Sequence, residues 1–362
     1  MPMKAAQDLR FRMLKKTLLC SLALIGLLLN SCSSNSDSVS ISPKVQTASV
    51  AGNADDCAIW IHPTDRNLSL IIGNDKRGGG GLYGWNLQGE IVFYYGPFIK
   101  PINLDVRYGF SLGSKKVDIL VVGTHSDNTL RVFMIDPDER KLVDVTVPGG
   151  IPTGAGYQIY GLSLYQNPKT EEVSAFVSQV KSEGDLIQIA LSDDGNGRVR
   201  GRILRTFGGK DIKNIVEGMC ADDELGFLYC SDERIGILKF HAEPEMGDEP
   251  IARFAIADGI KGDREGIALY ECPDGRGYLI LSSQGNDQLK VYDRAGNNPF
   301  VLTVNKKGST RTDGIGATSC QIGRFPHGFI VCHNDQNANF VLYDWDDIAK
   351  DKLLKCSCSE AY

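Results

Sequence analysis

Six residues with oxygen-bearing side chains recur at similar intervals along the chain. They are Asp55, Asp105, Tyr160, Glu217, Glu265 and Asp313. The spacings are 50, 55, 57, 48 and 48 residues, and Gly follows each of the last three. In a repeat protein such residues occupy equivalent positions, so five carboxylates and a phenol would converge. Like charges at close range raise each other's pKa, and hard cations with oxygen ligands relieve the repulsion. The pattern therefore indicates a calcium site.

The alternative is that each acid–glycine pair forms a turn and the carboxylates are solvated. The repeated spacing of 48 residues among the last three members weighs against this alternative. Asp56, Glu233 and Asp263 lie close enough in the sequence to join the same cluster.

Basic residues occur in loops beside these acids, namely Lys76, Arg77, His125 and Lys181. Fixed cations beside bound calcium would form a site for a highly charged anion, because the metal and the side chains neutralise phosphoryl oxygens together. The alternative is that these residues only keep the protein soluble.

Six units of similar length would have to position these residues. Each unit has an apolar run, a polar loop and a second apolar run. The first runs begin near Leu70, Asp118, Ala175, Phe227, Tyr278 and Gly328, at intervals of 48, 57, 52, 51 and 50 residues. These intervals are typical of propeller blades and too irregular for a solenoid. The sequence predicts an all-β, six-bladed β-propeller with a central channel, whose equivalent loops lie on one face.

Composition agrees with a globular β protein. The 362 residues are 42% hydrophobic and 23% charged, and 40 Gly beside 14 Pro indicate many tight turns. The net charge of -6, without a long basic run, argues against nucleic acid as a partner. The glycines at 78–81 are not followed by the Lys-Ser/Thr of a P-loop, and the chain has no Gly-x-Ser-x-Gly elbow.

The N-terminus has the pattern of an export signal. Lys15 and Lys16 precede an apolar stretch at 17–29, which is too short to span a bilayer. The residues at 29–32, Leu-Asn-Ser-Cys, resemble a bacterial lipobox. We therefore expect a lipoprotein signal peptide at 1–32, a flexible tether at 33–45 and the propeller at 46–362. The protein would be exported and lipid-anchored at Cys32, in the outer membrane or periplasm.

Export would deliver the cysteines to an oxidising compartment, where disulfides form. Cys220 and Cys230 flank one turn and Cys320 and Cys332 flank another, so each pair could lie on adjacent strands. No partner is assigned to Cys57, Cys272, Cys356 and Cys358. A zinc site at 356 and 358 lacks a second pair of ligands at suitable spacing.

Several motifs in order resemble the β-propeller phytases of bacteria, over about Ala51 to Ala349. These are Asp55 to Trp60, Asp105 to Tyr108, Tyr160 to Tyr165, Glu217 to Glu224, Asp263 to Gly266, Ser282 to Asn286 and Thr312 to Gly314. The resemblance implies a six-bladed propeller that binds several calcium ions and releases phosphate from myo-inositol hexakisphosphate (phytate). It also implies direct attack of a calcium-bound water on phosphorus and a neighbouring site for a second phosphate.

The resemblance implies roles for individual residues. The metal ligands would be Asp55, Asp56, Glu217, Glu233, Asp263, Glu265, Gln284 and Asp313. The catalytic residues would be Glu217, Glu265, Asp313 and Tyr160, and the phosphate contacts Lys76, Arg77, Tyr160, Lys181 and His125. Three features depart from the family pattern: Cys57 replaces Pro, His125 replaces Arg, and no Glu occurs at 42–50.

Two other functions remain open from the sequence. A calcium propeller of another hydrolase type, such as a lactonase, would need the acids but not Lys76, Arg77 and Lys181. A non-enzymatic surface propeller would bind a ligand or protein and use calcium only structurally. We expect a monomer that contacts the membrane only through its lipid anchor.

Overall fold

Short β-strands separated by turns build almost the entire described chain. The computed structural model describes residues 37–77, 79–98 and 100–358. The predicted signal peptide and the start of the predicted tether lie outside these residues. Within the described ranges, no helix combines the length and the apolar character that crossing a membrane requires.

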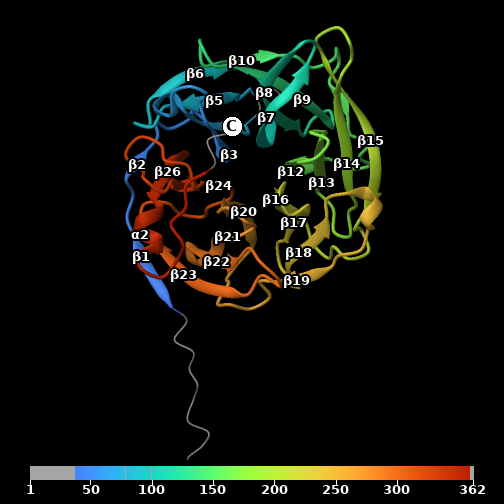
Figure 1. Cartoon of the computed structure of the whole chain (residues 1–362). Coiled ribbons are helices and arrows are strands. Elements are labelled where there is room, and N and C mark those ends of the chain that lie inside the picture. Colours follow the sequence, from blue (N-terminus) through green and yellow to red (C-terminus); the bar gives the residue numbers. More distant parts are fainter. Residues whose placement is uncertain (1–36, 78, 99, 359–362) are drawn as a thin grey trace, which may run out of the picture. The chain divides into compact units, whose positions relative to one another are not determined.

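The strands form six sheets arranged as the blades of a propeller (Figure 1). Blade 1 contains β3 (Ala54–Trp60), β4 (Leu70–Asp75), β5 (Leu82–Trp85) and β6 (Ile91–Tyr95). Blade 2 contains β7 (Pro101–Leu112), β8 (Lys115–Thr124), β9 (Thr129–Asp136), β10 (Lys141–Asp144) and β11 (Ile151–Pro152). Blade 3 contains β12 (Ile159–Gln166), β13 (Val173–Gln179), β14 (Leu186–Asp193) and β15 (Val199–Phe207).

The other three blades follow in chain order. Blade 4 contains β16 (Val216–Asp222), β17 (Phe227–Asp232), β18 (Gly236–His241) and β19 (Ala252–Phe254). Blade 5 contains β20 (Arg264–Glu271), β21 (Gly277–Ser283), β22 (Gln288–Asp293), β23 (Phe300–Lys306) and β1 (Ser38–Ile41). Blade 6 contains β24 (Ile315–Thr318), β25 (Phe329–Asn334), β26 (Asn339–Asp344) and β2 (Val45–Gln46). The helical elements among the described residues are η1 (Arg66–Leu68), η2 (Pro244–Met246), η3 (Gln284–Asn286), η4 (Asp335–Asn337) and α2 (Trp345–Ala349).

This architecture confirms the predicted all-β, six-bladed propeller. The first apolar run of each predicted unit is the second strand of a blade, and the polar loop joins that strand to the third. The first strands, β3, β7, β12, β16, β20 and β24, surround the centre (Figure 1). They line a cavity of about 900 Å³, which corresponds to the predicted channel.

Apolar side chains fill the space between neighbouring blades. Every residue of β13 is buried, because one face of this strand packs towards blade 2 and the other towards blade 4. Burial on both faces explains why the second strands read as continuous apolar runs instead of alternating ones. The packing between blades holds the first strands at fixed distances around the centre.

The N-terminal segment differs from the predicted flexible tether at 33–45. Ser38–Ile41 pairs in parallel with β23, and Val45–Gln46 pairs antiparallel with β26. The reason is the alternation of Ser with Val39 and Ile41, whose side chains are buried. A serine-rich segment is typical of a tether, but the spacing of these serines is that of a strand with one buried face. The β2–β26 pairing joins the two ends of the propeller within blade 6.

The disulfides also differ from the predicted pairs. Cys272 bonds to Cys356, and Cys320 bonds to Cys358. The predicted pairing of Cys220 with Cys230 was wrong. Cys230 lies opposite Met219 in the β16–β17 register, so the side chain of Cys220 points to the other face of the sheet. Cys332 lies opposite Ile315 at the start of β24, whereas Cys320 lies two residues beyond the end of that strand, so the two cysteines are not cross-strand neighbours. The bonded cysteines at 356 and 358 also exclude the zinc alternative at these positions.

The two disulfides attach the C-terminal segment to blades 5 and 6. Replacing both Cys272 and Cys356 with Ser should lower the free energy of unfolding by about 2–5 kcal/mol, because the unfolded chain regains the freedom that the cross-link removes. Urea denaturation measures the change. As a control, Cys220→Ser removes a thiol that is free in the structure and should leave the midpoint nearly unchanged. Equal midpoints for the parent and the double variant would contradict a stabilising role.

Candidate active site

A β-bulge places the predicted acids at the centre of the propeller. In β16 the register shifts between Val216 and Met219, and in β20 it shifts between Arg264 and Ile267. Corresponding shifts occur in β3, β7 and β12. In β3, β12, β16 and β20 the two residues inside the bulge are the acid, or Tyr160 in blade 3, and the residue that follows it. A bulge redirects side chains next to a functional site. The regular spacing of the acids in the sequence therefore follows from a bulge that these blades share.

The glycines that follow the acids permit close contact between adjacent first strands. A Cβ atom on Gly218 would lie 2.1 Å from the carbonyl oxygen of Glu265, and one on Gly266 would lie 2.4 Å from that of Asp313. The Gly266 N–H donates to the same Asp313 oxygen at 2.8 Å. Each acid–glycine pair is therefore part of an inter-blade contact, and the alternative of a solvated turn is wrong.

Asp105 does not belong to this set. The first of two register shifts in β7 lies between Pro101 and Leu104, so Ile102 is the residue equivalent to the acids of the other blades. Asp105 lies further along the strand, where its carboxylate accepts the Leu164 N–H at 2.8 Å and pairs with Arg107 at 3.0 Å. Asp105 was wrongly assigned because it follows Asp55 by 50 residues, an interval close to the length of a blade. It lies three residues after Ile102, the equivalent position of blade 2.

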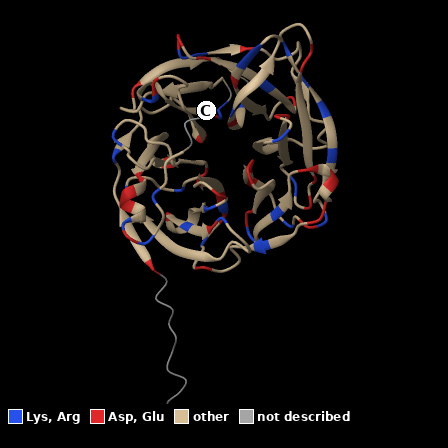
Figure 2. Ribbon diagram, in the orientation of Figure 1, with Lys and Arg blue, Asp and Glu red and all other residues tan. Residues whose placement is uncertain are grey.

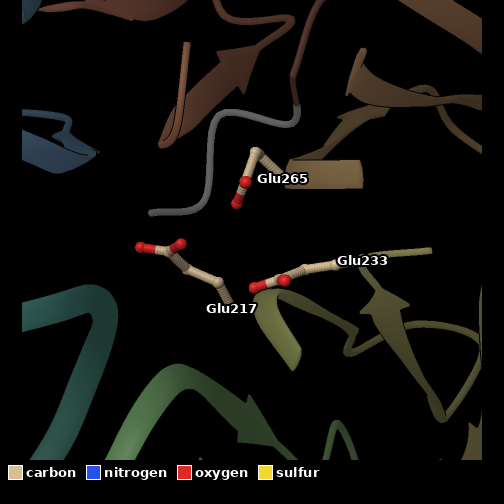
Figure 3. A group of neighbouring side chains, drawn as sticks. All are labelled: Glu217, Glu233 and Glu265. Carbon is tan, nitrogen blue, oxygen red and sulfur yellow. The ribbon is translucent and has the colours of Figure 1, made fainter. Parts of the chain in front are cut away.

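Three glutamates meet at the centre of the ring (Figure 3). One oxygen from each of Glu217, Glu233 and Glu265 lies within 4.8 Å of the others. Burial, followed by the charges of Asp55 and Glu265, raises the pKa of Glu217 well above its usual range. Burial and neighbouring acids also raise the pKa of Glu265 to about 8 and that of Glu233 to about 7. Without a cation, the cluster therefore favours bound protons.

Asp313 and Asp55 extend this cluster, with Lys76 between them. The Lys76 ammonium contacts the Asp55 carboxylate and lies 3.9 Å from that of Asp313. Gln284 donates to Asp313 at 2.7 Å. Burial and Asp55 raise the pKa of Asp313 to about 7. Burial alone would lower the pKa of Lys76, but the surrounding carboxylates hold it above its usual value, so the ammonium stays charged.

The donor set suits a hard divalent cation. Calcium prefers six to eight oxygen ligands, and carboxylates are the commonest among them. One oxygen each of Asp55 and Glu265 is buried and has no hydrogen-bond partner among the described residues. Buried polar atoms normally have a partner, so these oxygens are available to a cation. The residues present therefore fit calcium.

Two predicted ligands lie at the edges of the cluster. The Asp56 carboxylate accepts the Leu104 N–H at 3.1 Å and lines the central cavity, and burial raises its pKa to about 8. Asp263 is partly exposed and lies 3.7 Å from the Arg234 guanidinium. Its charge raises the pKa of the neighbouring Glu233.

Tyr160 and the predicted phosphate contacts lie on the same face. The Tyr160 hydroxyl donates to Glu217 at 2.7 Å. Arg77 and Lys181 are exposed in the loops that join the second and third strands of blades 1 and 3. His125 is 8% exposed, and its Nδ1 lies 3.0 Å from the Ile159 carbonyl oxygen. Burial lowers the pKa of His125, so its ring is neutral near pH 7. Figure 2 shows acidic segments near the centre of the ring and both acidic and basic segments around its rim.

The sequence analysis missed His333 of β25. Its side chain is fully buried, and its Nδ1 accepts the Asp313 N–H at 3.1 Å. This bond places the ring proton on Nε2, which has no partner among the described residues. His333 thus holds the backbone of an acid in the cluster. It lies within an apolar run, so no sequence signal distinguished it from a core residue.

Comparison with known proteins identifies this arrangement. The family model described as phytase matches residues 12–355. The chain belongs to the phytase family. It is 35% identical to the 3-phytase of Bacillus subtilis (strain 168) over 315 residues, which cover 82% of this chain and 80% of the relative. These matches confirm the resemblance seen in the sequence and the expectation that this phytase is an enzyme.

One solved structure was also compared with this phytase. The crystal structure of BBS1N in complex with ARL6DN, soaked with lead, has a TM-score of 0.47 and 13% identity. The match covers 79% of this chain and 77% of that chain.

The raised pKa values predict how pH acts on the metal-free protein. Glu233, Glu265 and Asp313 hold protons in the folded state up to about pH 7 or 8, whereas the unfolded chain releases them near pH 4. The folded state then binds more protons, so its stability falls as pH rises from about 4.5 to 8. In excess chelator, the melting temperature should therefore decline over this range.

Calcium should reduce this decline, because it stabilises the ionised cluster. The variant Glu265→Gln should also reduce it in chelator, because it removes one of the titrating groups. Scanning fluorimetry at several pH values measures both effects. If the melting temperature changes with pH equally in calcium, in chelator and in the variant, these carboxylates do not control the pH dependence of stability.

Proposed function

We propose that this phytase is a calcium-dependent phosphomonoesterase that hydrolyses myo-inositol hexakisphosphate and releases phosphate. The observation that carries the proposal is the cluster of Glu217, Glu233 and Glu265, whose oxygens lie within 4.8 Å of one another. Repulsion among these groups makes a cation site, and adjacent Lys and Arg side chains suit a polyanion. The similarity to a protein named 3-phytase supports the substrate.

Several calcium ions would be held by the eight predicted ligands. These are Asp55, Asp56, Glu217, Glu233, Asp263, Glu265, Gln284 and Asp313. Bound calcium would neutralise phosphoryl oxygens and lower the pKa of a coordinated water. The side chains of this chain would orient the substrate: Lys76 and Arg77 from blade 1 and Lys181 from blade 3 contact phosphate. Tyr160 donates a hydrogen bond to Glu217 and so fixes that carboxylate. It would also border the phosphate that these basic residues contact.

The position of Lys76 favours phosphate over the substrates of other calcium propellers. Its ammonium remains charged between Asp55 and Asp313, directly beside the proposed metal ligands. A lactonase-like enzyme would need the carboxylates but not this partly buried cation. A purely structural calcium site would not require the exposed Arg77 and Lys181 on the same face.

We further propose that the protein is an exported monomer with a lipid on Cys32. The basic residues and apolar stretch before Cys32 support export, as does the resemblance to a lipobox. The Cys272–Cys356 and Cys320–Cys358 disulfides suit an oxidising compartment such as the periplasm. Metabolic labelling with a fatty acid, compared between the parent and Cys32→Ala, tests the lipid attachment.

Removing one carboxylate tests the proposed function. Glu217→Gln keeps the size of the side chain but loses a charge that would hold calcium, so phosphate release from phytate should fall at least about a hundredfold, or roughly 3 kcal/mol in barrier height. Excess chelator should abolish the activity of the parent. Glu139→Gln is the control, because this exposed side chain lies in a distant turn. Near-normal turnover by Glu217→Gln, or turnover that resists chelator, would contradict the proposal.

The departure at His125 predicts a weaker phosphate contact than the family pattern implies. An Arg stays charged and offers a planar set of donors, whereas the neutral His125 ring already has one nitrogen at the Ile159 carbonyl. His125→Arg should lower the KM for phytate at pH 7. The parent should regain part of this binding only below about pH 6.5, the ordinary His value, because burial lowers the pKa.

Steady-state kinetics of the parent, His125→Arg and His125→Ala between about pH 5 and 8 measure this contact. If all three enzymes have the same KM across this range, His125 is not a phosphate contact and should be removed from the site.

A further inference from the structure

Lys181 differs from Lys76 in what holds its ammonium group. Lys76 contacts the carboxylate of Asp55, which offsets much of its charge. Lys181 instead lies over the ring of Tyr157, with its Nζ 4.6 Å from the ring centroid. Within the described part of the chain, no salt bridge includes Lys181. The nearby Glu183 pairs with Lys213 at 3.6 Å.

Tyr157 has an exposure that is unusual for an aromatic residue of this protein. Its side chain is 52% exposed, whereas most of the large aromatic residues are buried. It lies three residues before Tyr160, in the segment that leads into β12. The ring therefore contributes little to the core, and it contacts the Lys181 ammonium instead.

The backbone around this pair is fixed by Gln179, the last residue of β13. Gln179 accepts the Tyr157 N–H through its side-chain oxygen at 3.1 Å, and its amide donates to the Asp185 carbonyl at 2.9 Å. The Lys181 N–H donates to the Gln179 carbonyl at 2.7 Å, and the Gly184 N–H donates to the Lys181 carbonyl at 3.1 Å. The loop that carries the ring and the turn that carries the lysine are therefore joined.

We propose that Tyr157 is a positioning residue that holds the Lys181 ammonium ready for a phosphate group of the substrate. This inference rests on the proposed function. An aromatic face attracts a cation and limits the directions the side chain can take, but it does not neutralise the charge as a carboxylate does. The N–H groups directed away from the ring stay available to an anion. Lys181 thereby offers a full positive charge with less conformational freedom to lose on binding.

The ring, and not the hydroxyl group, should carry this effect. Tyr157→Leu removes the aromatic face, so the KM for phytate should rise about two- to fivefold, the range of an exposed cation–π contact. The kcat should change less than twofold, because Tyr157 touches no residue of the acidic cluster. Tyr157→Phe retains the ring and should behave like the parent.

A double-mutant cycle separates this role from a direct contact between Tyr157 and the substrate. Lys181→Met removes the ammonium but keeps a long side chain, and its KM should rise more than that of Tyr157→Leu. In the Lys181→Met background, Tyr157→Leu should have no further effect, because the ring would have no cation to hold. Additive effects of the two substitutions would overturn the inference. A loss in Tyr157→Phe equal to that in Tyr157→Leu would also overturn it, by assigning the effect to the hydroxyl.

A binding measurement keeps this inference separate from the proposed function. Calorimetric titration with myo-inositol hexasulfate, a polyanion of similar shape, reports binding without turnover. If the parent fails to release phosphate from phytate, the proposed function is wrong, and the calorimetric cycle still tests the Tyr157–Lys181 pair. If the parent is active and Tyr157→Leu matches it in both KM and hexasulfate affinity, the positioning role is wrong and the proposed function stands.

Discussion

Crowding of carboxylates at the centre of the ring is the constraint to which the rest of the structure responds. Glu217, Glu233 and Glu265 bring oxygens within 4.8 Å of one another, and their pKa values are raised by burial and mutual repulsion. A flexible scaffold would let such groups separate into solvent. The propeller prevents this because Glu217 and Glu265 lie in bulges of first strands and Glu233 directly follows a second strand, and packing between blades fixes these strands on both sides.

The close approach of the first strands explains several local features together. The backbone after Glu217 lies so near the Glu265 carbonyl that only glycine fits at position 218. The ring must also be closed, because an open gap between blades would release the same repulsion. The short β2–β26 pairing closes blade 6, and the two disulfides attach the C-terminal segment to blades 5 and 6. The fold thus holds together carboxylates whose mutual repulsion a bound cation would relieve.

The sequence was sufficient for the fold and for most of the acids, because both follow from repetition. Glu217 and Glu265 occupy the same bulge in equivalent blades, and Asp313 lies just before the first strand of the next blade, so these acids recur at a constant interval of 48 residues. The failures occurred where blades are not equivalent. Asp105 has a plausible interval but lies past the bulge, and the true equivalent, Ile102, has no polar atom by which to recognise it. The disulfides join the C-terminal segment to distant strands, and such contacts depend on tertiary packing that local spacing does not encode.

The cations on this face divide into two kinds, and the division follows from their surroundings. Lys76 is partly buried among carboxylates that keep it charged, so it balances the cluster as well as facing a ligand. Lys181 is exposed and lies against an aromatic ring, so its charge is not offset by an acid. A polyphosphate that enters the site would meet both kinds. Lys76 would add little attraction at a distance, because the charge of Asp55 offsets its own. Lys181 would attract an anion at longer range, over a distance that salt screening limits. Local charge balance would therefore fall to Lys76, and attraction of an anion to exposed cations such as Lys181.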